Sequence, residues 1–146
     1  PKRIILDKNL DIKLKSYIFK SAKKGNTILF YNSSNTKKIK VLKKKGLTLI
    51  KTKLNNEGLL DLKIVLKKLF TLGTRSLLVE GGDKISKNLI KNRLIDTFYL
   101  FQSPKILRVN KINQGFTSFG ILNGKYKKVS KITSKLAKDN ITIYKR

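Results

Sequence analysis

Short apolar runs alternate along the chain with segments in which apolar side chains recur every three or four positions. The first pattern is typical of buried strands and the second of helices with one apolar face. The clearest helix follows Asp61, carries Leu62, Val65, Leu66 and Leu69 at i, i+3, i+4 and i+7, and ends at Gly73. Further helices are predicted around Ile39 and Leu42 up to Gly46, over residues 83–92 and, for one or two turns, within residues 13–24. The predicted strands are 3–7, 27–31, 47–50, 76–79, 97–101, 116–122, 126–133 and 140–144, with a turn at Asn123-Gly124.

Helices that alternate with apolar strands predict an α/β fold. We expect a mainly parallel sheet flanked by helices, followed by antiparallel strands at the C-terminal end. The chain has 146 residues, 40% of them hydrophobic, and contains no repeat or linker-like segment, so residues 1–146 are expected to form a single domain. Because a predicted strand follows Pro1 almost at once, we also expect the chain to be a fragment of a longer polypeptide.

Cysteine and histidine are both missing, and their absence excludes several kinds of site. Without cysteine there are no disulfides, thiolate metal sites or cysteine nucleophiles, and without histidine there is no Ser-His-Asp arrangement. No metal site is therefore predicted. No apolar run approaches the roughly 18 residues of a membrane span, and no secretory signal opens the sequence, which favours a cytoplasmic protein without a membrane partner.

The charge is strongly positive, with 35 Lys and Arg against 8 Asp and Glu. Such a balance usually indicates a nucleic acid or an anionic membrane as the partner. Only five of the basic residues are arginine, however, and lysine, asparagine and isoleucine are abundant while alanine is scarce, as an AT-rich coding sequence would produce. We therefore expect most of the charge to lie on solvated faces and do not expect a nucleic-acid partner, although a non-catalytic basic module that binds RNA remains an alternative.

One segment carries candidate chemistry: the predicted strand 76–79 ends in Glu80-Gly81-Gly82, and a helix begins at Asp83. Glycines allow a ligand to approach the backbone closely, and the unsatisfied N–H groups and dipole of a helix start favour a phosphate or pyrophosphate. Glu80 would stand at the carboxyl edge, where open α/β sheets place their ligands. The alternative is a plain strand-to-helix turn with Asp83 as the N-cap. Neither the GxGxxG fingerprint nor a P-loop is present.

Four segments appear in a characteristic order: Arg3-Ile4-Ile5-Leu6-Asp7, Leu77-Leu78-Val79-Glu80-Gly81-Gly82, Leu94-Ile95-Asp96 and Ser103-Pro104-Lys105-Ile106-Leu107. Together they resemble the reductase domain of riboflavin biosynthesis, the C-terminal half of a bifunctional deaminase/reductase. The resemblance covers nearly the whole chain. It implies a dihydrofolate-reductase-like fold, NADPH as hydride donor, a homodimer and a possible zinc deaminase domain upstream in the same chain. The implied reaction reduces the ribosyl C1′ of the phosphorylated pyrimidine 5-amino-6-(5-phosphoribosylamino)uracil to the ribitylamino product.

The resemblance also implies roles for individual residues, but it assigns no catalytic residue. Glu80 would contact the substrate. The positions implied to bind NADPH are Lys8, Gly81, Gly82, Asp83, Lys84, Ile85, Ser86, Lys87 and Asn88. The chain departs from the family pattern at Arg108, where glycine is usual, at Thr97, which replaces an acidic residue, and in lacking the opening strand. A related pyrimidine or pterin reductase of the same fold remains an alternative.

The late segments 116–122 and 140–144 carry aromatic and branched residues. We expect them to pack against a symmetric partner, because two-fold pairing is the commonest arrangement of soluble homo-oligomers.

Overall fold

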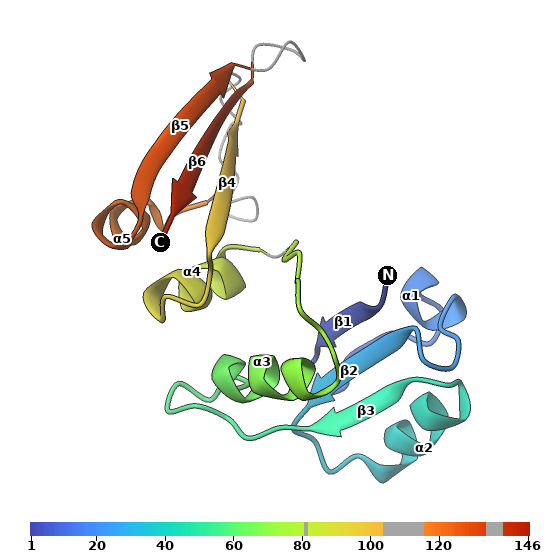
Figure 1. The fold of residues 1–146 in the computed structure, drawn as a ribbon. Coiled ribbons are helices and arrows are strands. Elements are labelled where there is room, and N and C mark those ends of the chain that lie inside the picture. The colour runs from blue at the N-terminus through green and yellow to red at the C-terminus, as the bar shows by residue number, and fades with distance from the viewer. Residues whose placement is uncertain (81, 104–115, 134–138) are drawn as a thin grey trace, which may run out of the picture. The chain divides into compact units, whose positions relative to one another are not determined.

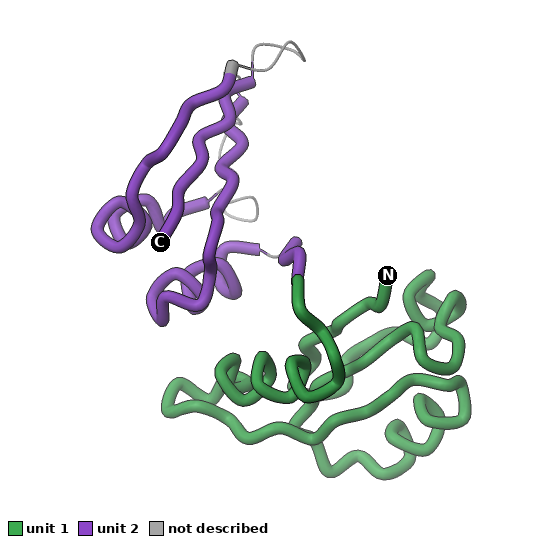
Figure 2. The backbone as a smooth tube through the Cα atoms, in the orientation of Figure 1, with its two compact units in different colours: residues 1–76 green, residues 77–146 purple. Residues whose placement is uncertain are grey.

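The computed structural model describes residues 1–80, 82–103, 116–133 and 139–146. Contacts divide the chain into two compact units, residues 1–76 and residues 77–146, which we call unit 1 and unit 2 (Figure 2). Unit 1 contains a parallel three-stranded sheet and unit 2 an antiparallel one. The predicted α/β class with antiparallel C-terminal strands is confirmed.

Unit 1 is built around one fully buried strand. Strand β2 lies between β1 and β3 and pairs in parallel with both, with Arg3 opposite Thr27 and Ile28 opposite Thr48 (Figure 1). Parallel strands need crossover connections, and the helices in those connections cover the faces of the sheet. The elements are β1 (Arg3–Leu6), α1 (Tyr17–Lys20), β2 (Thr27–Tyr31), α2 (Thr36–Lys44), β3 (Thr48–Lys51) and α3 (Leu62–Thr71).

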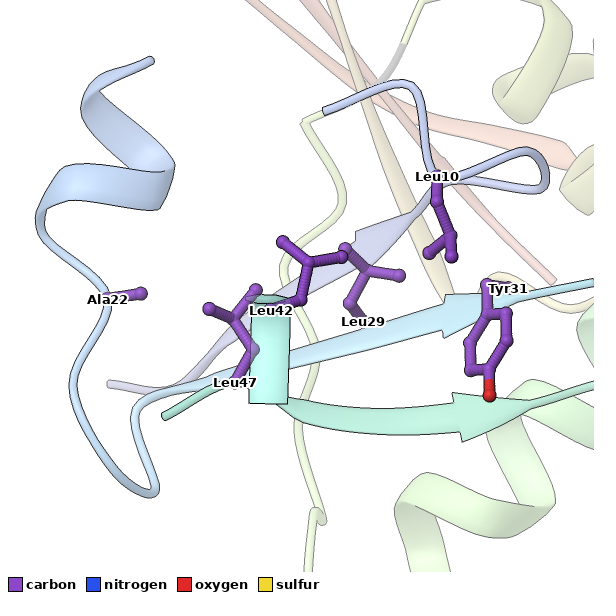
Figure 3. Close-up of a cluster of buried hydrophobic side chains, with 6 residues drawn as sticks. All are labelled: Leu10, Ala22, Leu29, Tyr31, Leu42 and Leu47. Carbon is purple, nitrogen blue, oxygen red and sulfur yellow. The ribbon is translucent and has the colours of Figure 1, made fainter. Parts of the chain in front are cut away.

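Successive side chains of β2 point to opposite faces of the sheet, so this strand contributes to two cores. On the face covered by α1 and α2, Leu29 and Tyr31 belong to a cluster with Leu10, Ala22, Leu42 and Leu47 (Figure 3). On the face covered by α3, Ile28 and Phe30 pack with Leu60, Val65 and Leu69.

The helix boundaries in unit 1 follow the predicted signals. The carboxylate of Asp61 accepts hydrogen bonds from the N–H groups of Lys63 at 2.9 Å and Ile64 at 3.2 Å, so Asp61 is the N-cap of α3. Gly73, just after this helix, has φ +85°, a left-handed conformation that glycine adopts without strain.

Unit 2 packs two helices against an antiparallel sheet with the strand order β4-β6-β5 (Figure 1). Its core contains Ile90, Leu100, Leu122, Tyr126 and Tyr144. The elements are α4 (Asp83–Lys91), β4 (Thr97–Gln102), α5 (Phe119–Lys125), β5 (Lys127–Thr133) and β6 (Asn140–Lys145).

The prediction of a buried strand over residues 76–79 is wrong. These residues belong to no strand of the described chain, and the side chains of Leu77, Leu78 and Val79 are 39%, 81% and 40% exposed. The apolar run has the composition of a strand, but a strand also needs a neighbour to accept its backbone hydrogen bonds. No described strand pairs with this run.

The predicted strand 116–122 and the turn at Asn123-Gly124 are also wrong. Helix α5 occupies most of this stretch and includes both turn residues. Leu122 is fully buried, and Tyr126, four positions later, shares its core. This i, i+4 spacing is that of a helix face.

Among the described helices, none combines the length and apolar composition that a membrane span requires.

Candidate functional site

The N-terminus of α4 is the part of unit 2 that the sequence predicts to hold a phosphate. Gly82 is its N-cap, no side chain caps it, and the carbonyl of Gly82 accepts hydrogen bonds from the N–H groups of Ile85 and Ser86, each at 3.2 Å. A Cβ built on Gly82 would meet no heavy atom within 4 Å, so the space beside this residue is open. An uncapped and accessible helix start favours binding of an anion. Gly81 lies outside the described residues.

Asp83 is the first residue of α4 and not its N-cap, so the alternative role considered for it from the sequence is wrong. Its carboxylate accepts hydrogen bonds from the N–H of Thr117 at 3.0 Å, the hydroxyl of Thr117 at 2.6 Å and the hydroxyl of Ser118 at 3.2 Å. The two bonds from Thr117 are the main reason why the pKa of Asp83 is below its usual value, with smaller contributions from Ser118 and from the charge of Lys87. The carboxylate thus links the start of α4 to the segment that leads into α5.

The other predicted cofactor residues of unit 2 follow along α4. Lys84 and Lys87 are exposed, whereas Ile85 and Ser86 are partly buried. Asn88 lies more than one turn from the helix start, and its side-chain oxygen accepts a hydrogen bond from the Asn92 amide at 3.2 Å. The structure therefore brings residues 83–88 together on one helix, but only its first turn presents free backbone N–H groups.

Glu80, the predicted substrate residue, is exposed. Within the described residues its carboxylate forms no hydrogen bond and no ion pair, although the chain is rich in lysine. The strand predicted to present it at a sheet edge is absent. Glu80 instead lies in an irregular segment two residues before the N-cap of α4.

Lys8, the remaining predicted cofactor residue, belongs to unit 1 and follows β1 at the carboxyl edge of the parallel sheet. Its Nζ donates a hydrogen bond to the carbonyl of Gly58 at 3.2 Å, and its own carbonyl accepts one from the N–H of Asn32 at 2.8 Å. The side chain of Asn32 donates to the carbonyl of Thr52 at 2.7 Å. These bonds join the segments that follow all three strands.

The segment after β2 has a second helix start that the sequence analysis did not identify, at the carboxyl edge of the parallel sheet. Asn35 is the N-cap of α2, and the first turn of this helix contains Lys37 and Lys38 and no acidic residue. Two lysines at the positive end of the helix dipole are unfavourable. An anion bound there would interact favourably with both lysines and with the dipole. At the same edge the hydroxyl of Thr52 is buried, and it has no hydrogen-bond partner in the part of the chain that the structure describes. The N-cap pattern Asn35-Thr36-Lys37-Lys38 is the sequence signal for this second helix start.

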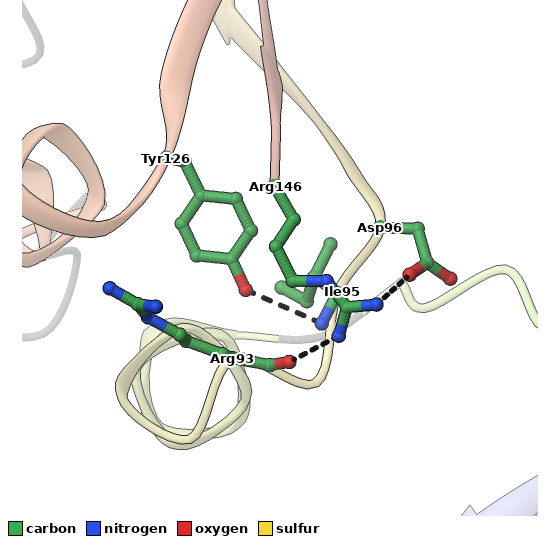
Figure 4. A network of polar contacts seen from close by, with 5 residues as sticks. All are labelled: Arg93, Ile95, Asp96, Tyr126 and Arg146. Carbon is green, nitrogen blue, oxygen red and sulfur yellow. Dashed lines mark hydrogen bonds and ion pairs between the residues drawn. The ribbon is translucent and has the colours of Figure 1, made fainter.

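Asp96, which belongs to one of the segments that resemble the reductase family, has a structural role. The guanidinium of Arg146 forms an ion pair with its carboxylate at 3.4 Å and donates a hydrogen bond to the carbonyl of Arg93 at 3.1 Å (Figure 4). Nearby, the hydroxyl of Tyr126 accepts a hydrogen bond from the N–H of Ile95 at 3.4 Å. These contacts hold the end of β6 to the segment that precedes β4. The last of the four segments that resemble the reductase family includes residues 104–107, which lie outside the described residues. Arg108, where the family usually has glycine, also lies outside them.

Comparison with known proteins identifies the family. Residues 1–137 match the family described as the RibD C-terminal domain. The chain belongs to this family. The riboflavin biosynthesis protein RibD of Aquifex aeolicus (strain VF5) is 35% identical over 107 residues, and that of Actinobacillus pleuropneumoniae is 26% identical over 107 residues. Each alignment covers 73% of this chain and 28% of the relative, so the chain spans under a third of these curated proteins.

Solved structures share the fold. Acinetobacter baumannii RibD, form 2, has a TM-score of 0.72 and 20% identity, with 99% of this chain and 37% of that chain covered. A pyrimidine reductase-like protein of Corynebacterium diphtheriae has a TM-score of 0.70 and 17% identity, with 99% of this chain and 60% of that chain covered. The chain thus has the fold of these solved structures.

The Asp83 carboxylate is expected to make stability depend on pH. Because its folded-state pKa lies below the unfolded value of about 3.9, its contribution is present above about pH 4 and is lost as the pH falls through the folded pKa. Asp83→Asn should lower the free energy of unfolding by about 1 kcal/mol near neutral pH, a value reduced by solvent exposure, and by less below about pH 4. Urea denaturation of the wild type and of Asp83→Asn, at neutral and at acidic pH, measures this difference in the free energy of unfolding. Glu80→Gln is the control, and an equal effect of Asp83→Asn at every pH would contradict the assignment.

Proposed function

We propose that the chain is the NADPH-dependent reductase domain of riboflavin biosynthesis, which reduces the ribosyl C1′ of 5-amino-6-(5-phosphoribosylamino)uracil. Membership of the RibD C-terminal domain family supports this function. The structural observation that carries it is the uncapped, open helix start directly after Glu80-Gly81-Gly82. Because the family match spans both units, it supports a single reductase domain, which in a longer chain would follow a deaminase domain.

The described residues fit a phosphate-bearing cofactor. The first N–H groups of α4 and the exposed Lys84 would hold its pyrophosphate, because the carboxylate of Asp83 is bonded to Thr117 and Ser118 and does not cap these N–H groups. Within unit 1, Lys8 is the residue that the family resemblance assigns to the cofactor, and its positive charge suits a phosphate group. When bound, NADPH supplies the hydride, so the protein needs no histidine for this chemistry.

Glu80 would orient the sugar of the substrate. Its carboxylate has no partner among the described residues and could accept charge-assisted hydrogen bonds from sugar hydroxyls, which would position the ribosyl carbon for reduction. A reductase for another pyrimidine is the second candidate function. It is favoured by the fold shared with a pyrimidine reductase-like protein, at 17% identity.

We also propose that two copies associate through the outer face of the unit 2 sheet. Pairing places Tyr99 opposite Ile143 and Phe101 opposite Ile141, and Tyr99 and Phe101 are 56% and 68% exposed. On β5, Ile132 pairs with Ile141 on the same face and is 50% exposed. An exposed apolar patch of this kind normally marks an association surface. Of the segments expected to form the interface, 140–144 contributes to this face, whereas Phe116 and Leu122 pack in the core of unit 2.

The first functional prediction concerns the cofactor site. NADPH at a hundredfold excess over its Kd should stabilise the chain by about 2.7 kcal/mol, measured by thermal unfolding. Gly82→Val should abolish this stabilisation, because the branched side chain would occupy the open space through which the phosphate approaches. Gly82→Ala, whose single carbon meets no neighbour, should keep most of it. Equal stabilisation of the wild type and Gly82→Val would show that NADPH does not bind at this helix start.

The second prediction concerns Glu80. Glu80→Gln should lower the rate of NADPH oxidation with the aminopyrimidine substrate by about tenfold to a hundredfold, as loss of a charge-assisted hydrogen bond implies, and leave NADPH affinity nearly unchanged. The measurement is made on the complete polypeptide that carries this chain. Glu57→Gln, at the only other glutamate, should have no effect on the rate. Loss of cofactor affinity in Glu80→Gln would instead give Glu80 a role in supporting the glycine turn.

The third prediction concerns association. Light scattering should detect a dimer at moderate salt that dissociates or precipitates at low salt. Each copy has a formal charge of +27, and salt is needed to screen the repulsion between the two copies. The double variant Tyr99→Ser, Phe101→Ser should be monomeric at moderate salt. Phe70→Ser, which removes a 61% exposed aromatic side chain from unit 1, should still dimerise. A wild-type monomer at every salt concentration would disprove the dimer.

A further inference from the structure

The acidic residues of unit 1 lie at one edge of its parallel sheet, whereas exposed lysines lie at both edges. Because the strands are parallel, the segments that lead into β2 and β3 meet at one edge, which we call the amino edge. Helix α1 and the turn after it precede β2, and the end of α2 precedes β3. Six exposed lysines lie on these segments: Lys20, Lys23, Lys24, Lys43, Lys44 and Lys45.

All four acidic residues of unit 1 lie at the opposite, carboxyl edge. Asp7 directly follows β1 and accepts a hydrogen bond from the N–H of Asp11 at 2.8 Å. Glu57 adjoins Gly58, whose carbonyl is bonded to a side chain just after β1. Asp61 is the N-cap of α3, and its N–H donates to a carbonyl two residues after β3. No acidic residue of unit 1 therefore neutralises the field of the six lysines at the amino edge.

Packing holds the two lysine segments against each other. A Cβ built on Gly46, at φ +99°, would lie 3.0 Å from the backbone nitrogen of Lys24, so these backbones are in close contact. Beneath them, Ala22 shares a core cluster with Leu42 and Leu47 (Figure 3). The fold therefore places the two segments that carry these exposed lysines side by side, and together they form the basic surface of this edge.

An exposed aromatic ring adjoins this surface. Tyr17 begins α1, three residues before Lys20, and its side chain is 81% exposed. Phe19 is on α1, like Tyr17, and the Nζ of Lys45 lies 5.9 Å from the centroid of the Phe19 ring. This contact brings the end of α2 close to α1. The guanidinium of Arg3, by contrast, is bonded to the hydroxyl and the carbonyl of Ser21 and is not free to read a base edge.

We infer that the amino edge of unit 1 binds single-stranded nucleic acid, with the six lysines neutralising phosphates and Tyr17 stacking on a base. Binding of single strands combines such a basic surface with exposed aromatic rings and needs no bidentate contact to a base. The negative end of the α2 dipole accounts for Lys43 and Lys44 alone, whereas the lysines before β2 are not on that helix. This activity goes beyond the proposed reductase and does not depend on it, because the expected cofactor residues Lys8 and 82–88 are not on these segments.

The test compares two triple variants with the same change in charge. Binding of oligo(U) and oligo(dT), each of about 12 nucleotides, is measured by fluorescence anisotropy at several salt concentrations. The variant Lys23→Gln, Lys24→Gln, Lys44→Gln should reduce the slope of log K against log salt by about 2, because each lost phosphate contact contributes about 0.7. The control replaces Lys51, Lys53 and Lys63 with glutamine as well. These lysines are exposed at the carboxyl edge, and the control should leave the slope of log K against log salt unchanged. Binding to oligo(U) alone would identify RNA as the ligand, and equal binding of both would identify single strands in general.

Tyr17 provides an independent measurement. Tyr17→Ala should weaken oligonucleotide binding by about tenfold, whereas Tyr17→Phe, which keeps the stacking ring, should bind as the wild type does. Thermal stabilisation by NADPH should be the same in the amino-edge triple variant and in both Tyr17 variants as in the wild type, so failure of this inference is distinguishable from failure of the reductase assignment. Equal loss of binding in both triple variants would overturn the inference, and so would tighter binding to vesicles of anionic lipid than to either oligonucleotide.

Discussion

Parallel pairing on both sides of β2 is the constraint on which unit 1 depends. It requires crossover helices and buries both faces of the central strand, so the chain must supply two separate apolar clusters, one from Leu29 and Tyr31 and one from Ile28 and Phe30. The same pairing sends every strand end to one edge and every strand start to the other. Lys8, Asn32 and Thr52 meet at the first edge for this reason, although more than forty positions separate the first from the last.

In unit 2, Asp83 joins the start of α4 to the segment before α5 by bonding to Thr117 and Ser118 across 34 and 35 positions of sequence. A carboxylate at a helix start normally competes with an incoming anion for the same N–H groups. Here two hydroxyls and one N–H satisfy it from another segment, so the backbone donors of α4 have no side-chain cap. The contact that joins α4 to α5 therefore also leaves the helix start available for a phosphate, which connects the stability of this unit with its proposed function.

Much of the fold follows from local signals. The turn at Gly25-Asn26 and the run from Thr27 to Tyr31 predict β2, and Asp61 with its i, i+3, i+4 pattern predicts α3. The prediction for residues 76–79 is wrong because their composition is that of a strand, but a strand also needs a neighbouring strand to pair with. No described strand pairs with these residues. Helix α5 was missed because Asn123-Gly124 is a strong turn signal, and only the burial of Leu122 beside Tyr126 favours the helix. The role of Asp83 depends on a contact with Thr117 that no local pattern reveals.

The distribution of lysine is the clearest case in which topology adds to composition. The sequence predicts an excess of positive charge but not where on the surface it lies, since drift toward lysine codons would place lysines on any solvated face. Within unit 1 the fold gives the net charge a direction, because all the acidic residues lie on segments after the strands, whereas lysines lie both before and after them. The carboxyl edge keeps a mixed charge and polar side chains suited to a small phosphorylated ligand. The amino edge keeps only positive charge, and a polyanion is the ligand that such a surface attracts most strongly.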